Sequence, residues 1–345
     1  MADLTVLTAS FDENDRGTTG RLTLLDWGRR SLRERASLAL ERPSYLAPGP
    51  RGSVYVSHEL PDSRVSLVGL GPDGMRVLDE RQVPGRWACH LSVHPSGRWI
   101  GVAPYASPLV ALLGVDEAGR FTSHTSTVEF DGSGPNAQRQ EAPHPHQFVF
   151  SPDGRQAFVP DLGSDRIHVL SVDGSGRLES EADLELPPGT GPRHLVLTRR
   201  YLAVCGELDG RVYWTRRNRP ADWRSVAATA AAQGQPSAIL RWSGRDSVLV
   251  ASRSPGTVRA LALGDDGARV LLDAHAGQAP RDVIRRGARL LVADRPNDEL
   301  LALEPDGEGM RVAARFAVPT PACILPVRGA ARGERPPGTP ADRSR

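Results

Sequence analysis

The stretch "HPHQFVFSPDGRQAFVPDL", residues 144–162, decides the fold. It predicts two short strands joined by a tight turn, because Pro, Asp and Gly in "SPDG" supply the preset and positive φ angles that such a turn needs. Phe and Val, which favour strands, flank the turn on both sides. We therefore expect a β-hairpin here, with His144 and His146 at its mouth.

The same pattern of a Pro or small residue, an apolar strand, a polar turn and a second strand recurs along the chain. Five further segments share it: "RPSYLAPGPRGSVYVSHE", "ACHLSVHPSGRWIGVAPY", "GPRHLVLTRRYLAVCGE", "QPSAILRWSGRDSVLVASR" and "APRDVIRRGARLLVADR". The anchors, separated by 45, 57, 47, 44 and 44 residues, are Pro43, Ala88, Pro145, Pro192, Pro236 and Pro280. A seventh anchor, Pro321, follows 41 residues later with no second strand behind it. Such a period indicates a repeat architecture.

Most hairpins are followed by a third strand, as in "RIHVLSVD" and "LLALEPD", and then by a more variable fourth. Four antiparallel strands per unit of about 40–50 residues are typical of a β-propeller blade. The N-terminal segments "LTVLTASF", "GRLTLLDWG" and "RASLALER" can supply the strands that the last unit lacks. We therefore predict an all-β, seven-bladed β-propeller whose ring is closed by N-terminal strands completing the C-terminal blade. A β-sandwich or two smaller β domains would explain neither the regular spacing nor the complementary ends.

The propeller is predicted to be one domain over residues 1–328. Residues 329–345 are expected to form a disordered tail, because the final stretch "RGAARGERPPGTPADRSR" is rich in Pro, Gly and Arg and has nothing to bury.

Composition restricts the partners. The formal net charge of +2, with acids and bases interspersed, argues against nucleic acid, and no apolar run approaches the length that spans a membrane. The three cysteines are far apart, and the N-terminus "MADLTVLTASFDEN" lacks the pattern of a secretory signal, so we expect a cytoplasmic monomer or weak homodimer. Every cationic residue is Arg, which excludes mechanisms that need a lysine amine.

Closure of the ring brings two positions of every repeat to one face, because the first and second strands of a blade are antiparallel. The residues directly after the anchors are Ser44, Cys89, His146, Arg193, Ser237, Arg281 and Ala322. The residues at the ends of the second strands are Glu59, Tyr105, Leu162, Glu207, Arg253 and Arg295. We expect the charged members to converge at one mouth of the channel. Such a funnel is more typical of an enzyme than of a protein-binding face.

The histidine pair has three interpretations. Alternate residues of a strand share a face and could bind one metal ion, but the expected neighbours are arginines, which repel cations, so we expect no metal and no cofactor. A histidine near a strand start is often only structural. His146 follows the anchor and is the catalytic candidate, whereas His144 ends the insertion "FDGSGPNAQRQEAP" and is expected to position that loop or to contact substrate.

The segments "HPHQFVFSPDGRQAFVPDLGSDRIHVL", "GTGPRHLVL" with "GELDGRVYW", and "HLSVHPSGRWIGVAPYASPLVALL" resemble the lactonase family of seven-bladed propellers, up to about Leu325. The family includes propeller-type 6-phosphogluconolactonases and 3-carboxy-cis,cis-muconate lactonizing enzymes. The resemblance implies a metal-independent site for a small anionic lactone or carboxylate. The catalytic residues that it implies are His146, Glu207, Arg193 and Arg253. Residues expected to bind substrate are His144, His90, Tyr105, Glu59, His194, Arg281 and Arg295.

The chain also departs from the family pattern. Gly206 replaces the usual Asn before Glu207, and Pro104 replaces the Asn before Tyr105. These changes alter the pocket walls and leave the acid, base and cations intact. A lactonizing cycloisomerase or a specialised biosynthetic enzyme could use the same pocket, and a non-catalytic propeller could bind a protein or peptide on this face. His146 and Glu207 can divide the acid and base work, and the sequence does not say which takes which role.

Overall fold

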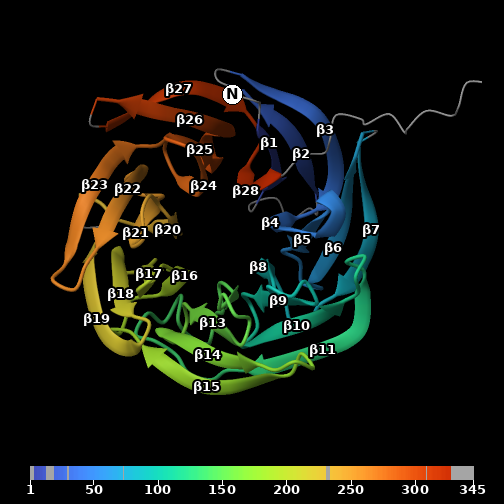
Figure 1. Cartoon of the computed structure of the whole chain (residues 1–345), viewed down its shortest axis with the longest axis horizontal. Coiled ribbons are helices and arrows are strands. Elements are labelled where there is room, and N and C mark those ends of the chain that lie inside the picture. The colour runs from blue at the N-terminus through green and yellow to red at the C-terminus, as the bar shows by residue number, and fades with distance from the viewer. Residues whose placement is uncertain are drawn as a thin grey trace, which may run out of the picture.

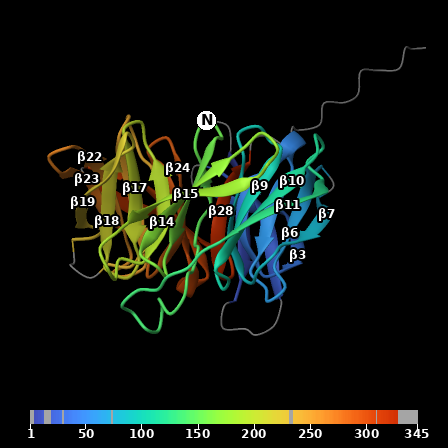
Figure 2. The same ribbon diagram turned by 90° about the horizontal axis from the view of Figure 1, so that it is seen from below.

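The computed structural model describes residues 4–12, 19–28, 31–72, 74–230, 234–307 and 309–327. In these residues, 28 strands form seven four-stranded antiparallel sheets that surround a central channel (Figure 1), which confirms the seven-bladed propeller. The blades stand side by side around the ring, and the connections between strands lie at its two faces (Figure 2). The predicted tail, residues 329–345, lies outside the described residues.

Six blades are built from consecutive strands, each running from the channel to the outer edge. Blades one to three consist of β4 (Pro43–Pro48), β5 (Val54–His58), β6 (Arg64–Gly71) and β7 (Gly74–Gln82); β8 (Ala88–Val93), β9 (Trp99–Pro104), β10 (Leu109–Val115) and β11 (Phe121–Glu129); and β12 (Val149–Phe150), β13 (Gln156–Asp161), β14 (Arg166–Val172) and β15 (Leu178–Glu185). Blades four to six consist of β16 (Pro192–Leu197), β17 (Tyr201–Gly206), β18 (Arg211–Arg216) and β19 (Arg219–Ala227); β20 (Pro236–Arg241), β21 (Ser247–Ser252), β22 (Thr257–Leu263) and β23 (Ala268–His275); and β24 (Pro280–Arg286), β25 (Arg289–Asp294), β26 (Glu299–Asp306) and β27 (Gly309–Ala317).

The seventh blade joins the two ends of the described chain. Its inner strand β28 (Pro321–Val327) pairs with β1 (Leu4–Phe11), which is followed by β2 (Thr19–Trp27) and β3 (Leu32–Glu41). The red β28 lies beside the blue β1 in Figure 1. The predicted closure of the ring by N-terminal strands is therefore confirmed.

The hydrophobic core is divided among the interfaces between neighbouring blades. Seven clusters of buried side chains each combine residues of two adjacent blades. Between blades two and three, for example, Leu112 packs in one cluster with Phe148 and Val159. Both faces of a blade are buried in this way, and burial of each large apolar side chain contributes about 1.5–3 kcal/mol. Packing between blades therefore fixes the ring.

The inner strand pair of every blade contains one extra residue directly after the anchor. In blade four Pro192 pairs with Gly206 and His194 with Cys205, so Arg193 has no partner on β17. Blade three has the same shift, since Pro145 bridges to Asp161 while Val149 pairs with Phe158. The equivalent residues elsewhere are Ser44, Cys89, Ser237, Arg281 and Ala322. A β-bulge of this kind redirects a side chain, here at one end of the channel.

The close contact between blades two and three predicts the effect of a substitution at Gly101 in β9. A Cβ atom at Gly101 would lie 2.3 Å from a ring carbon of Phe148, which is fully buried in the next blade. We expect Gly101→Ala to lower the free energy of unfolding by about 1–3 kcal/mol through overpacking, measured by urea denaturation. Gly174→Ala is the control, because a Cβ there would meet no atom within 4 Å. Equal stability of the two variants would contradict the tight fit between blades two and three.

Candidate active site

The bulged residues meet in the channel. A cavity of about 20 Å³ is lined by Ser44, Tyr45, Cys89, His146, Arg193, His194, Arg281, Asp282 and Ala322. Six of these nine directly follow an anchor of the repeat. A volume of this size holds about one water molecule, so a sugar-sized ligand has to bind above it, at the mouth.

Hydrogen bonds from the bulges tie blade one to blade two, blade four to blade five and blade five to blade six. Ser44 Oγ donates to the carbonyl oxygen of Ala88 at 2.8 Å, and Ser237 Oγ donates to that of Pro280 at 2.5 Å. Arg193 Nη1 donates to the carbonyl oxygen of Ser237. The mouth of the channel is therefore held at a fixed diameter, which gives its charged side chains fixed separations.

Glu207, directly after β17, is the centre of the charged cluster. Its amide donates to the Gly191 carbonyl oxygen at 2.8 Å, and its side chain is only 5% exposed. Oε2 lies 2.7 Å from Nε of Arg193 and 2.7 Å from Nη2 of Arg253. Oε1 accepts a hydrogen bond from Nη2 of Arg139 at 2.8 Å. One buried carboxylate thus faces three guanidinium groups.

The arginines determine the ionisation of Glu207. Burial alone would raise its pKa, but Arg253, Arg193 and Arg139 outweigh burial and lower the pKa to about 2. Glu207 is therefore a carboxylate at any physiological pH. Three cations against one anion leave an excess of positive charge at the mouth, which attracts anionic ligands.

His146 lies beside this cluster as a neutral base. It is buried, its ring meets those of Tyr105 and His194 edge-on at 5.5 and 5.4 Å between centroids, and its Nδ1 is 3.8 Å from Cys89 Sγ. Burial, followed by the charge of Arg193, lowers the pKa of His146 well below its ordinary value. One nitrogen of a neutral imidazole can accept a proton.

His144 fastens the insertion to the second blade. Its ring stacks on Tyr105 with centroids 4.7 Å apart and planes inclined by 14°. Nδ1 lies 3.0 Å from the Tyr105 carbonyl oxygen, and Nε2 lies 3.1 Å from Oε1 of Glu141. With both ring nitrogens occupied, the arrangement fits the expected loop-positioning role better than direct contact with substrate.

His90 and His194 lie deeper than the rim. The ring of His90 lies 4.0 Å from that of Tyr45 and 5.7 Å from that of His194. Burial and then Arg193 lower the pKa of His90 to about 3. His90 also borders an apolar groove at the opposite mouth. The structure therefore places His90 inside the channel, away from the expected substrate contact.

Glu59, Arg281 and Arg295 differ in how close they come to the cluster. Arg281 lines the same cavity as Arg193 and contributes to lowering its pKa. The carboxylate of Glu59 acts on Cys89 and helps to raise the pKa of its thiol, which burial raises most, to about 12. Arg295 instead lies over the ring of Phe11, 4.6 Å from its centroid, and donates to its carbonyl oxygen at 2.5 Å. The structure therefore directs Arg295 to Phe11 of the adjoining blade.

Sequence reasoning missed Arg139, which lies in the insertion between β11 and β12. The one signal was the interval of 57 residues between anchors, with Arg139 inside the added stretch. The stretch lies outside the repeated strand pattern. The repeat therefore cannot indicate which of its residues face the channel.

Metal ligands do not cluster in the described part of the chain: it contains no group of three or more His, Cys, Asp or Glu side chains arranged to hold an ion. The same residues include no helix long and apolar enough to cross a membrane.

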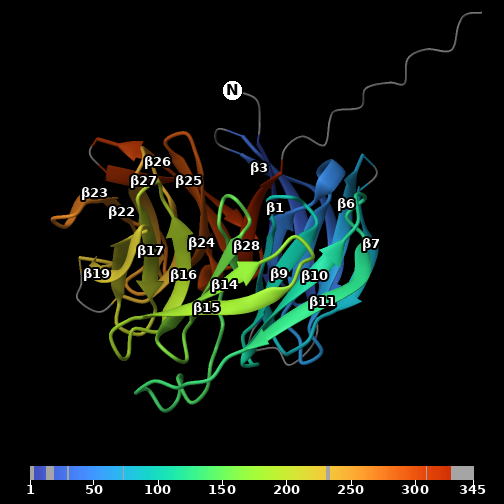
Figure 3. The ribbon, with the colours of Figure 1, turned by 60° about the horizontal axis from the view of Figure 1, so that its bottom comes forward.

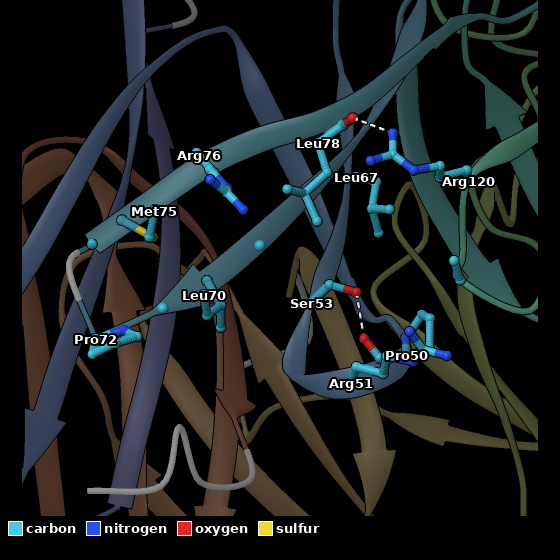
Figure 4. A pocket seen from close by; sticks show the side chains of 14 residues that line it. Pro50, Arg51, Ser53, Leu67, Leu70, Pro72, Met75, Arg76, Leu78 and Arg120 are labelled. Carbon is cyan, nitrogen blue, oxygen red and sulfur yellow. Dashed lines mark hydrogen bonds between the residues drawn. The ribbon is translucent and has the colours of Figure 1, made fainter. Parts of the chain in front are cut away.

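A larger groove, of about 500 Å³, lies between blades one and two, at the face opposite Glu207 (Figure 4). Arg51, Arg76 and Arg120 line it together with apolar side chains such as Leu67 and Met75. Arg120 Nη1 donates to the Leu78 carbonyl oxygen at 2.7 Å. Among the described residues that line the groove there is neither a carboxylate nor a histidine, unlike the cluster at the other mouth.

The buried charges predict the stability of a Glu207 variant. Glu207→Gln leaves Arg193, itself 4% exposed, without its carboxylate, and we expect a loss of about 3–5 kcal/mol in the free energy of unfolding at pH 7. Folding lowers the pKa of Glu207 from 4.5 to about 2, so its stabilisation is complete above pH 4.5 and is lost as the pH falls through 2. The difference from wild type should therefore shrink in urea unfolding at pH 3.

Glu34→Gln is the matched control. Glu34 pairs with Arg21 at 3.3 Å, but the two side chains are 51% and 39% exposed, so this variant should lose less than about 1 kcal/mol. If Glu207→Gln were as stable as Glu34→Gln, the buried carboxylate would not be holding the arginines together.

The chain matches a family model and known proteins. The family model for "Lactonase, 7-bladed beta-propeller" matches residues 6–326. A 6-phosphogluconolactonase of Bacillus subtilis is 25% identical over 322 residues, which cover 87% of this chain and 92% of that protein. A probable 6-phosphogluconolactonase of Arthroderma benhamiae is 38% identical over 180 residues, 49% of this chain and 45% of that protein.

Solved structures share the fold. A putative 6-phosphogluconolactonase of Bacteroides fragilis superimposes with a TM-score of 0.84 at 22% identity, over 95% of this chain and 98% of that one. The periplasmic gluconolactonase of Pseudomonas aeruginosa gives a TM-score of 0.83 at 22% identity, over 95% and 99%. With the family model extending over nearly the whole propeller, the chain belongs to the lactonase family of seven-bladed β-propellers.

Proposed function

We propose that this protein hydrolyses a small anionic lactone derived from a sugar, of the 6-phosphogluconolactone type, without a metal ion. The observation that carries the proposal is the buried Glu207 carboxylate held by three arginines at the channel mouth, beside the neutral base His146. The names of the relatives support the same reaction class, since the Bacillus subtilis protein is a 6-phosphogluconolactonase.

The ionisation of the two candidate groups assigns their roles. Opening a lactone needs an activated water, stabilisation of the oxyanion and a proton for the leaving alkoxide. Glu207, whose pKa is lowered to about 2, has no proton to donate at neutral pH. His146 accepts a proton from water as the water oxygen bonds to the lactone carbonyl carbon. The imidazolium then returns that proton to the ring oxygen as the carbon–oxygen bond breaks.

The arginines supply the charge that the oxyanion needs. The Arg253 side chain is 26% exposed, although its Nε is buried and makes no hydrogen bond within the described part of the chain. It is therefore suited to donate to an oxyanion above the cavity, while Glu207 holds its Nη2 in place. Arg193 is almost fully buried and serves to fix Glu207. Glu207 thus acts by positioning the cations and not by moving a proton.

A cytoplasmic monomer or weak homodimer is part of the proposal. Cys89, Cys205 and Cys323 are all free thiols, as expected for a protein that works in a reducing compartment. A muconate cyclisation assay tests the lactonizing direction in parallel with hydrolysis.

Replacing His146 tests the mechanism. We expect His146→Ala to lower kcat for 6-phosphogluconolactone hydrolysis roughly a hundredfold or more, because the variant lacks the proposed acceptor of the proton from water. The protein should be assayed on phosphorylated and neutral sugar lactones, with and without EDTA, and EDTA should leave the rate unchanged. His275→Ala is the control, since His275 is exposed on the outer strand β23.

A His146→Ala variant with nearly wild-type activity would exclude His146 as the base. If wild type opened no lactone but cyclised a muconate, the lactonizing alternative would replace hydrolysis. A wild-type protein that neither opens a lactone nor cyclises a muconate would favour the non-catalytic, partner-binding propeller.

A further inference from the structure

The insertion between β11 and β12 is built into the propeller. It extends beyond the face of the ring that carries Glu207, as the green segment after β11 in Figure 3. Gln140 fastens it from a fully buried position: Nε2 donates to the Leu162 carbonyl oxygen at 2.9 Å and to Asp165 Oδ1 at 2.8 Å. Arg139, which precedes Gln140, is therefore held at a defined place over the mouth of the channel.

The same anchor also holds the loop that carries Glu207. Asp165 Oδ1 accepts the amide of Gly191 at 2.7 Å, and the Gly191 carbonyl oxygen accepts the amide of Glu207 at 2.8 Å. Arg139 and Glu207 are thus positioned from one carboxylate, although 68 residues separate them in the chain. Their contact is a consequence of the buried hydrogen bonds beneath them.

Arg139 covers the solvent side of Glu207. Its Nη2 lies 2.8 Å from Oε1 of Glu207 and donates weakly to the Tyr105 hydroxyl at 3.5 Å. Arg139 is 41% exposed, whereas Arg193 is 4% and Arg253 is 26% exposed. Both inner arginines contact Oε2, so Glu207 keeps two cationic partners if Arg139 turns away.

The guanidinium of Arg139 has donors to spare. Its Nη1 and Nε make no hydrogen bond or ion pair within the part of the chain that the structure describes. A guanidinium fork can bind a phosphate or carboxylate through two parallel hydrogen bonds. An anion that approaches from solvent meets this group before it reaches Arg253 or the more deeply buried His146.

We infer that Arg139 recognises the anionic group that the substrate carries outside its lactone ring, a phosphate monoester or a carboxylate, and so determines specificity. The inference rests on the proposed lactone hydrolysis and adds the residue that selects the charged substrate. The ring reacts beside His146 and Arg253, and the anionic substituent pairs with Arg139 at the outer edge. Oε1 of Glu207 and the anionic substituent of the substrate compete for the guanidinium of Arg139.

Arg139→Met tests this selection. The ratio of kcat/KM for 6-phosphogluconolactone to that for the uncharged gluconolactone should fall roughly 10- to 100-fold, the range expected for a lost charge-assisted hydrogen bond. Most of the loss should appear in KM for the phosphorylated lactone, and Arg139→Lys should restore part of it. Comparison of kcat/KM for a lactone that carries a carboxylate in place of the phosphate shows which of the two anionic groups Arg139 prefers. The control is Arg86→Met, an exposed arginine on the same face, which should leave the ratio unchanged.

Binding of inorganic phosphate, measured by calorimetry, separates this inference from the proposed reaction. Wild type and Arg86→Met should bind it equally, and Arg139→Met should bind it at least tenfold more weakly. Equal affinity in Arg139→Met, or no binding by wild type, overturns the role of Arg139 even in an active lactonase. If phosphate binding depends on Arg139 but no lactone is opened, the proposed hydrolysis fails and the anion site stands.

Discussion

In every blade, one residue after the anchor falls outside the pairing of the two inner strands, and this bulge separates the chemistry of the mouth from the packing of the ring. The faces of each blade are committed to apolar contacts with the neighbouring blades, as between Leu112 and Phe148. A guanidinium on such a face would be buried without water or a partner. At the bulge, Arg193 points into the channel and leaves the clusters beside it intact.

Glu207 offsets the repulsion among the arginines that it contacts at this mouth. Arg193, Arg253 and Arg281 act on one another, since the last two help to lower the pKa of Arg193, which burial lowers most. A buried ion pair gains little net stability, but removal of one partner is strongly destabilising. Glu207 is thus expected to stabilise the folded state as well as the site, because its two oxygens lie 2.7–2.8 Å from Arg139, Arg193 and Arg253.

The features that the sequence predicted are those that repeat. Proline anchors and polar turns recur with the blades, so the ring, its closure and the convergence of His146, Arg193, Glu207 and Arg253 followed from strand direction alone. The position of Arg139 did not follow, because it depends on hydrogen bonds of Gln140 to residues more than 20 positions away. Strand direction also does not determine where Arg295 points. It is at the expected end of its strand, but its side chain turns to the aromatic ring of Phe11 in the adjoining blade.

Arginines of the same mouth also weaken the proposed base, His146. Burial, Arg193, Arg281 and Arg253 all lower the pKa of His146, so in the free protein its imidazole holds a proton poorly. A phosphate or carboxylate held by Arg139, as inferred above, would add negative charge at this mouth and offset part of the effect of these cations on the pKa of His146. A base works best when its pKa is near the operating pH. An anionic substituent on the lactone would therefore do more than tighten binding, because it would bring His146 closer to the basicity that the attack of water requires.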